Sequence, residues 1–183
     1  MRRATAIAAL AAAAVLGTAQ LVQADSATVT DARGDIVGEP PGGGESADIV
    51  AAAYGHTKSG KLWHKVTIAG QAADPAAGGG VLPLLYIDDD SGPGRGAREC
   101  DFLVGRHDGR LGVFECGSLE RVGSVRVTRT SEYSTRYVFS PKAIGNPDEY
   151  GWAFVTEGPS DGTWMRYDRV PEGDRAFRAH TLR

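Results

Sequence analysis

The sequence lacks the short motifs that mark most enzyme and nucleic-acid-binding classes. It contains no GxSxG nucleophile elbow, no GxGxxG or P-loop glycine pattern, and no HxH or HExxH spacing among its four histidines. Basic residues are in the minority, because 20 Lys and Arg stand against 23 Asp and Glu, for a formal net charge of −3. These absences argue against a nucleotide-binding enzyme, a zinc enzyme and a general nucleic-acid binder. They also leave no residue identified as catalytic.

Long hydrophobic runs are absent except near the N-terminus. The chain starts Met-Arg-Arg, and residues 4–16 form an apolar run that is shorter than the roughly 20 residues needed to span a bilayer core. A basic start, a short apolar run and a small residue at Ala24 are typical of a signal peptide over residues 1–24, with Ala19 as a second cleavage position. The remaining residues, 25–183, should form one secreted domain without a membrane span.

Cysteine is scarce, since only Cys100 and Cys116 are present, and outside the cytoplasm an even pair is expected to be bonded. Turn-forming residues at 107–109 lie between them, and a three-residue hairpin loop there places Cys100 directly opposite Cys116. The disulfide would close a loop of about 15 residues and add about 3 kcal/mol in the chain-entropy account. The same register sets Asp101 opposite Glu115, an unfavourable like-charge pair. A redox-active pair is the alternative, but CxxC spacing is missing.

Helical periodicity is also scarce, because 25 glycines and nine prolines interrupt the chain. Alternation of apolar and polar residues is common instead, and residues 81–87 are apolar on both parities, as in a central strand with Pro83 at a bulge. The alternating segments are residues 62–68, 125–128, 137–139 and 150–154, and the expected loops are residues 38–46, 71–80, 89–98 and 158–162. The sequence therefore predicts an all-β fold, an antiparallel β-sandwich (immunoglobulin-like or jelly-roll-like) of about eight or nine strands.

A series of short motifs runs along the chain. The motifs are DARGD at residues 31–35 with Asp48, LYIDDD at 85–90, CDFLV at 100–104, YVFS at 137–140, IGNP at 144–147, YGW at 150–152 and DRVPEGD at 168–174. Together they resemble the secreted bacterial β-sandwich group that includes DOMON-like and family 9 carbohydrate-binding-module-like domains. The resemblance implies a non-catalytic module that binds sugars, haem or calcium, or that accompanies an enzyme. Haem would have to use Met165, the one methionine left after removal of the leader.

Three carboxylates, Asp31, Asp35 and Asp48, lie at the ends of the first two expected strands. If the intervening loop folds back, their oxygens meet, and calcium prefers such hard oxygen ligands. A structural calcium ion would then fix the loop of residues 38–46, and the resemblance points to the same site. The alternative is that these aspartates accept hydrogen bonds from local amides in turns. A second acidic run, at residues 88–90, lacks the calcium-loop spacing and is expected to be solvated.

Two tryptophans are candidate ligand-binding residues. Trp63 has the parity opposite to the apolar residues of its segment, so its ring should face outward, where it could stack on a sugar ring or a partner. Cover by a neighbouring loop or sheet is the alternative. Trp164 is a similar candidate on an expected loop, whereas Trp152 should lie in the core. His64 shares the apolar parity and is expected to be a hydrogen-bonded core histidine.

These observations predict a non-catalytic extracellular binding or interaction module, with carbohydrate or a cell-envelope component as its partner and no nucleic acid. The alternative is a secreted hydrolase or hydrolase inhibitor whose acting loop has no recognisable motif. A glycosidase would need two carboxylates about 5–9 Å apart in a cleft. The identity of the ligand and the oligomeric state are beyond what the sequence predicts.

Overall fold

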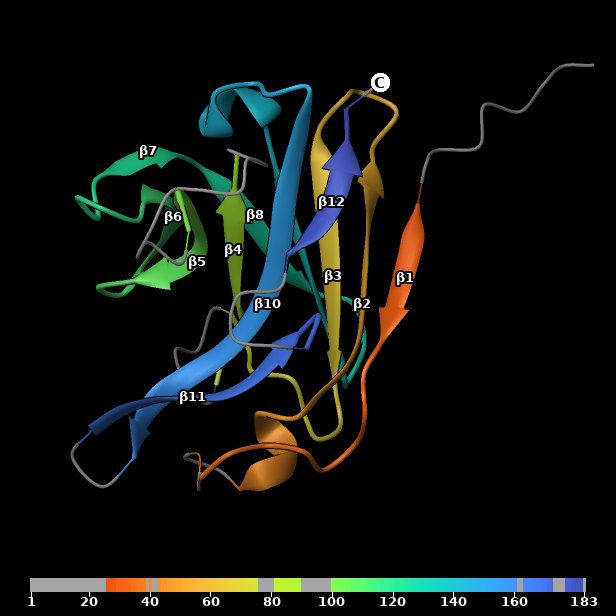
Figure 1. Cartoon of the computed structure of the whole chain (residues 1–183), viewed down its shortest axis with the longest axis vertical. Coiled ribbons are helices and arrows are strands. Elements are labelled where there is room, and N and C mark those ends of the chain that lie inside the picture. Colours follow the sequence, from red (N-terminus) through yellow and green to blue (C-terminus); the bar gives the residue numbers. More distant parts are fainter. Residues whose placement is uncertain are drawn as a thin grey trace, which may run out of the picture.

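The computed structural model describes residues 26–38, 40, 43–75, 81–89, 100–160, 163–172 and 177–182, and for residues 159, 160, 163 and 164 it describes the backbone. The predicted signal peptide and its cleavage site lie outside these residues. The described chain forms two antiparallel sheets packed face to face (Figure 1). This arrangement confirms the predicted all-β sandwich.

One sheet has five strands in the order β1-β2-β3-β9-β8. These strands are β1 (Ala27–Thr30), β2 (Ile49–His56), β3 (Leu62–Ile68), β9 (Ser134–Phe139) and β8 (Val125–Arg129). A 3-10 turn, η1 (Gly44–Ser46), lies between β1 and β2, and a second, η2 (Pro141–Ile144), follows β9. We refer to this layer as the five-stranded sheet.

The second sheet has the order β11-β10-β4-β5-β6-β7, and β12 also pairs with β10. Its strands are β11 (Thr163–Val170), β10 (Glu149–Ser160), β4 (Leu84–Asp88), β5 (Phe102–His107), β6 (Arg110–Glu115), β7 (Arg121–Gly123) and β12 (Arg178–Thr181). Twelve strands are therefore described where eight or nine were expected. The shortest of them, such as β7 and β12, contain too few residues for alternation to be visible in the sequence.

The core forms because the strands alternate. On β3 every second residue from Leu62 to Ile68 is buried, and on β10 the side chains of Tyr150, Trp152 and Phe154 are fully buried against them. Burying one large apolar side chain contributes about 1.5–3 kcal/mol, so this layer supplies much of the stability. The predicted core parities of both segments are confirmed.

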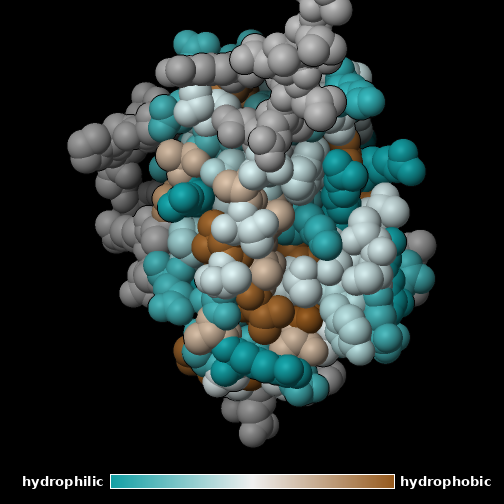
Figure 2. Space-filling view, turned by 90° about the vertical axis from the view of Figure 1, so that its right-hand side faces the viewer, coloured by the Kyte–Doolittle hydropathy of each residue, from teal (hydrophilic) through white to brown (hydrophobic). Residues whose placement is uncertain are grey.

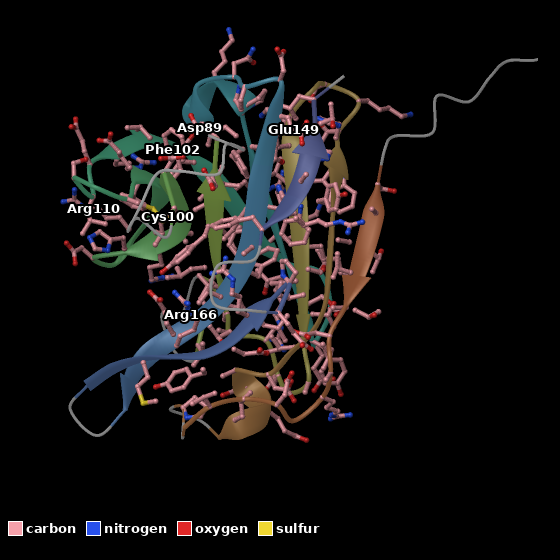
Figure 3. All side chains as sticks on the ribbon, viewed as in Figure 1. Asp89, Cys100, Phe102, Arg110, Glu149 and Arg166 are labelled. Atoms are coloured by element: carbon pink, nitrogen blue, oxygen red, sulfur yellow. A yellow bond between two sulfur atoms is a disulfide. The ribbon has the colours of Figure 1, made fainter. Side chains whose placement is uncertain are left out.

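The hairpin of β5 and β6 carries the disulfide, whose sulfur atoms lie beside the label of Cys100 in Figure 3. The Cys100–Cys116 bond is confirmed, with the two Cα atoms 6.0 Å apart. The predicted register is wrong by one residue, because Phe102 pairs with Glu115. The loop has two residues, Asp108 and Gly109, both with positive φ, as a two-residue hairpin turn requires.

The one-residue shift also removes the expected conflict of charge. The amide of Cys116 donates to the carbonyl of Asp101, so Asp101 does not lie opposite Glu115. A hairpin disulfide can therefore form without the like-charge pair that the three-residue loop would have imposed.

Two other local expectations are corrected. The central strand β4 starts at Leu84, after Pro83, and lies between β10 and β5. Residues 158–162 were expected to be a loop, but β10 continues to Ser160 and β11 starts at Thr163, with these two residues paired. Gly158 and Pro159 hide the alternation there, because one has no side chain and the other is usually excluded from strands.

The edges of the sandwich bring its two layers together. In Figure 1, β12 and then β11 run beside the long strand β10, close to the first strands of the five-stranded sheet. Seen from the side that carries β1, hydrophobic residues gather in the lower half of the surface and are flanked by hydrophilic ones (Figure 2). The side chain of Asp168 on β11 contacts the start of β2 here, because its carboxylate accepts a hydrogen bond from the Ile49 amide.

Candidate metal centre

Five acidic residues from four segments meet at this edge. Asp31 follows β1, Asp35 lies in the next loop, and Asp48 directly precedes β2. Asp168 lies on β11 of the other sheet, and Glu172 follows that strand. We call these five residues the acidic cluster.

Local hydrogen bonds fold the first loop back onto the start of β2. The amide of Asp31 donates to the carbonyl of Val50 (3.0 Å), and the amide of Gly34 donates to Oδ2 of Asp48 (2.8 Å). Gly34 has a φ of +84°, a conformation that glycine adopts without a steric penalty. The amide of Val37 then donates to the carbonyl of Tyr167 on β11 (2.8 Å). The loop is thus held between the two sheets.

The carboxylates form two groups that share Asp35. One group contains Asp31, Asp35 and Glu172, and the other contains Asp35, Asp48 and Asp168; within each group one oxygen from every residue lies within 4.8 Å of the others. The three aspartates predicted from the sequence therefore do come together. Asp168 and Glu172 were not predicted as site residues.

Asp48 is the most informative member of the cluster. It is 2% exposed, and while its Oδ2 accepts the Gly34 amide, its Oδ1 has no hydrogen-bond partner among the described residues. Oδ2 of Asp31 is likewise buried without a partner, and its Oδ1 accepts from the Ala32 amide. One oxygen of each residue thus serves a local amide. Leaving the other oxygen buried and unpaired is unfavourable unless a cation or a proton satisfies it.

Electrostatics within the cluster favour an added positive charge. The pKa of Asp31 is raised to about 7, first by burial, then by the negative charge of Asp168 and by the short approach of Glu172. Burial also raises the pKa of Asp168 to about 6, although the amides of Ile49 and Arg169 oppose the shift. The nearest basic side chain in the loop, Arg33, is paired with Glu45 at 3.3 Å.

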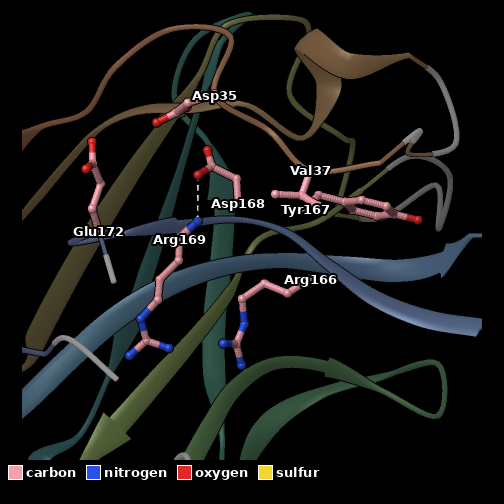
Figure 4. Close-up of a pocket in the computed structure, with 7 residues that line it drawn as sticks. All are labelled: Asp35, Val37, Arg166, Tyr167, Asp168, Arg169 and Glu172. Carbon is pink, nitrogen blue, oxygen red and sulfur yellow. Dashed lines mark hydrogen bonds between the residues drawn. The ribbon is translucent and has the colours of Figure 1, made fainter. Parts of the chain in front are cut away.

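A cavity of about 420 Å³ opens beside the acidic cluster. Its lining residues are Asp35, Val37, Arg166, Tyr167, Asp168, Arg169 and Glu172 (Figure 4). In the figure the carboxylates of Asp35 and Asp168 lie near each other, whereas the guanidinium groups of Arg166 and Arg169 point away from them, beyond the ribbon of β11. In this view the carboxylates of Asp35 and Asp168 thus lie on one side of β11, and the two guanidinium groups lie on the other.

The tryptophans predicted to bind a ligand lie elsewhere. Trp63 is on the outer face of the five-stranded sheet, half-buried, with its Nε1 donating to the carbonyl of His56 (3.1 Å). The guanidinium carbon of Arg136 lies 4.7 Å from the centre of its ring. Trp164 is on strand β11, opposite Pro159, and not on a loop as expected. Its side chain lies outside the described part of the chain.

The remaining sequence candidates have structural explanations. His64 is fully buried, and its Nε2 shares a 2.8 Å hydrogen bond with the hydroxyl of Tyr150, so the predicted core role is confirmed. Burial lowers the pKa of His64 well below its ordinary value. In the second acidic run, the amide of Asp89 donates to Oδ2 of Asp101 (3.1 Å), and Asp90 lies outside the described residues.

Comparison with known proteins identifies no relative: no protein-family profile, curated protein or solved structure matches the chain. The resemblance to DOMON-like and carbohydrate-binding-module-like domains therefore stays a prediction. Within the described residues, no helix is long and apolar enough to cross a membrane.

Proposed function

We propose that the protein is a non-catalytic extracellular binding module whose acidic cluster holds calcium. The observation that carries the proposal is Asp48, whose buried Oδ1 lacks a partner among the described residues while its carboxylate lies beside those of Asp35 and Asp168. Hydrogen bonds to Asp48 and Asp168 already orient these carboxylates. A cation would meet ligands that the fold has placed in advance.

The donor set favours calcium over other common ions. All five residues offer carboxylate oxygen, and neither histidine nor cysteine belongs to the cluster, which argues against zinc and copper. Calcium accepts six to eight oxygen ligands in flexible geometry, whereas magnesium needs a near-ideal octahedron. The five carboxylates come from separate segments and range from buried to exposed, and such an irregular ligand set suits the more flexible ion.

An extracellular setting supports the same proposal. The Cys100–Cys116 disulfide fits an oxidising compartment, and extracellular calcium modules work with dissociation constants of about 0.1–1 mM. Carbohydrate or a cell-envelope component remains the partner class that we propose for the module. The signal peptide predicted over residues 1–24 is a further reason to propose an extracellular setting.

Thermal melting with calcium and with chelator tests the cation site. An ion that binds the folded state alone adds about 2.7 kcal/mol at a hundredfold excess over the dissociation constant, which for a domain of this length raises the melting midpoint by about 5–10 °C. We expect Asp48→Asn to lose most of this increase. Asp148→Asn, at an exposed position away from the cluster, should keep it. Equal midpoints in millimolar calcium and in chelator would contradict the proposal.

The same cluster gives a specific reason to test the alternative of a hydrolase. The pKa values of Asp31 and Asp168 are raised to about 7 and about 6 beside a cavity, as is common for catalytic acids. Release of reducing ends from a polysaccharide, lost in Asp168→Asn and retained in chelator, would favour a glycosidase. We expect no hydrolysis, because mutual repulsion in a cation site raises carboxylate pKa values in the same way.

A further inference from the structure

The charges of this protein are divided unevenly between its two sheets. None of the five strands β1, β2, β3, β9 and β8 contains Asp or Glu, although β3, β9 and β8 contain Lys65, Arg136, Arg126 and Arg129. The second sheet contains carboxylates on several strands, among them Asp88, Glu115 and Glu157. This division is unexpected in a chain with more acidic than basic residues.

Strand register gathers three of these cations on the outer face of the five-stranded sheet. Lys65 lies directly opposite Arg136, and Arg126 lies opposite Val138, which itself pairs with Trp63. Directly opposed side chains have Cβ atoms about 5 Å apart. Because Leu62, Val66 and Tyr137 of the same strands fill the core, these residues of the opposite parity face outward. We call Trp63, Lys65, Arg126 and Arg136 the basic face.

The cations of the basic face have no acidic partners in the described part of the chain. No carboxylate there lies within ion-pair distance of Lys65, Arg126 or Arg136. The Nε of Arg136 is buried without a hydrogen-bond partner. Surface cations that serve only solubility are usually interspersed with acidic residues, so an unneutralised set on one face points to an external anion.

Trp63 holds Arg136 in place. Its Nε1 hydrogen bond to the His56 carbonyl fixes the indole across the sheet, and the guanidinium lies over the ring at 4.7 Å. A guanidinium stacked on an aromatic ring can still bind a carboxylate edge-on through its two terminal nitrogens, and at Arg136 this pair is the one that applies, because Nε is buried. The ring that the sequence suggested as a sugar platform thus serves instead as a support for a cation.

The surroundings of the basic face suit an extended polysaccharide. The outward positions of β2 opposite Trp63 and Lys65 are Gly55 and Ala53, and neighbouring outward positions on β1 and β8 are threonines such as Thr28 and Thr128. Small side chains leave the sheet flat, and hydroxyl groups can bond to sugars. Trp63 is the one large aromatic side chain among these described positions, and the guanidinium group of Arg136 stacks on its ring.

We propose that the basic face binds a carboxylate-bearing polysaccharide, a polymer of uronic acids. Such a polymer carries a carboxylate on each sugar, which matches cations placed on adjacent strands. Without residues 1–24 the chain has 18 basic and 23 acidic residues, so its overall negative charge disfavours general binding of a polyanion and makes a local set of unneutralised cations the expected contact. The proposal rests on the proposed function in that the protein must lie outside the cell, but its residues are separate from the acidic cluster.

Calorimetric titration with short oligogalacturonate tests the proposal. The residue 25–183 chain is titrated in low and high salt, and a fully methyl-esterified oligomer serves as the neutral control. We expect binding to the acidic oligomer that weakens with salt, and none to the ester. Arg136→Gln should reduce affinity by about tenfold, the effect expected for a hydrogen-bonded charged group. Arg110→Gln, at an exposed position on β6 of the other sheet (Figure 3), should change nothing.

Further variants keep the test decisive. Arg126 is exposed, so Arg126→Gln should weaken binding without unfolding the protein, even if Arg136→Gln proves unstable. If Trp63 acts by positioning Arg136, Trp63→Leu should weaken binding, and the double variant with Arg136→Gln should be no weaker than Arg136→Gln alone. Additive losses would mean that Trp63 contributes to binding independently of Arg136, and would overturn its role as a positioning residue.

Several results would overturn the proposal. Equal binding of the acidic and esterified oligomers would exclude charge recognition, and unchanged affinity in both Arg126→Gln and Arg136→Gln would exclude this face. Binding to vesicles of anionic phospholipid but not to oligogalacturonate would identify a membrane surface instead. If the protein melts higher in calcium but does not bind the oligomer, the cation site is supported and this inference is wrong. If it binds the oligomer but melts at the same temperature in calcium and in chelator, this inference is supported and the cation site is absent.

Discussion

At the scale of single residues, the acidic cluster shows how a fold can gather charge that the local sequence does not balance. Asp48 is almost fully buried, yet one of its oxygens has no partner among the described residues. Asp31 repeats the pattern at lower burial. A cation would offset the charge of the cluster. Protons can do so at Asp31 and Asp168, whose pKa values are raised, so the charge of these two residues depends on pH.

Stability in chelator should fall as the pH rises from about 4 to about 7. The folded-state pKa values of Asp31 and Asp168 are raised from 3.8 to about 7 and about 6, so in this window the folded state binds more protons than the unfolded state. The stabilisation of the folded state by protonation of Asp31 and Asp168 is complete below about pH 4 and lost above about pH 7. Melting curves of the chain and of the double variant Asp31→Asn/Asp168→Asn, both in chelator, isolate the effect.

Calcium should remove this fall, because it binds the deprotonated carboxylates. The double variant should show a flatter profile than the natural chain in chelator. A profile that rises between pH 4 and pH 7 in the natural chain, but not in the variant, would mean that the pKa values of these groups are lowered on folding.

The hydrogen bond between His64 and Tyr150 gives a second residue-scale prediction. Tyr150→Phe removes the hydroxyl and leaves Nε2 of a fully buried histidine without its partner. We expect unfolding free energy to drop by about 1–3 kcal/mol, the cost of a buried unsatisfied polar group. Urea denaturation measures the change. Tyr133→Phe, at a position 47% exposed, is the matched control and should have no effect.

At the scale of elements, the hairpin of β5 and β6 combines a two-residue turn with a disulfide at its open end. Asp108 and Gly109 both adopt positive φ, which matches the twist of the flanking strands. The disulfide closes the hairpin where its strands meet the rest of the sheet. The turn and the covalent bond therefore support one register from opposite ends.

Removing the disulfide should lower stability without abolishing the fold. The double variant Cys100→Ala/Cys116→Ala is expected to lose about 3 kcal/mol, the chain-entropy value for a loop of this length. Urea denaturation gives the free energy. Reductant should shift the midpoint of the natural chain and leave that of the variant unchanged; a shift of similar size in both would assign the effect to something other than this bond.

At the scale of the whole molecule, the acidic cluster joins the two sheets. Asp31 and Asp48 belong to segments flanking strands of the five-stranded sheet, whereas Asp168 belongs to β11 of the other. A bound cation would therefore hold the first loop against the opposite layer. Arg33, exposed between two of the proposed ligands, is a natural reporter of that loop.

Calcium should slow tryptic cleavage after Arg33. Cleavage needs the loop to leave the surface, and a cation held by Asp31, Asp35 and Asp48 opposes this opening. Mass spectrometry of timed digests measures the rate. Cleavage after Lys58, in the exposed turn between β2 and β3, provides an internal control that calcium should not affect. An equal calcium effect at both bonds would point to inhibition of overall unfolding or of the protease.

Some of the site could be found from the sequence and some could not. Asp31, Asp35 and Asp48 lie within 18 residues of one another, so a single loop reversal was enough to predict their meeting. Asp168 and Glu172 follow more than a hundred residues later, and only the approach of β11 to the β2 edge brings them there. Their motif was visible in DRVPEGD, but nothing local connected it to the first loop.

The sequence by itself determined the layers of this protein, because alternation has a period of two residues and can be recognised within one strand. It also determined the disulfide partners, since two cysteines allow one pairing. The tertiary structure decided the hairpin register, the membership of the acidic cluster and the stacking of Arg136 on Trp63. These features depend on which strands become neighbours. Strand neighbours are set by packing of the whole core, which brings together residues that lie far apart in the sequence.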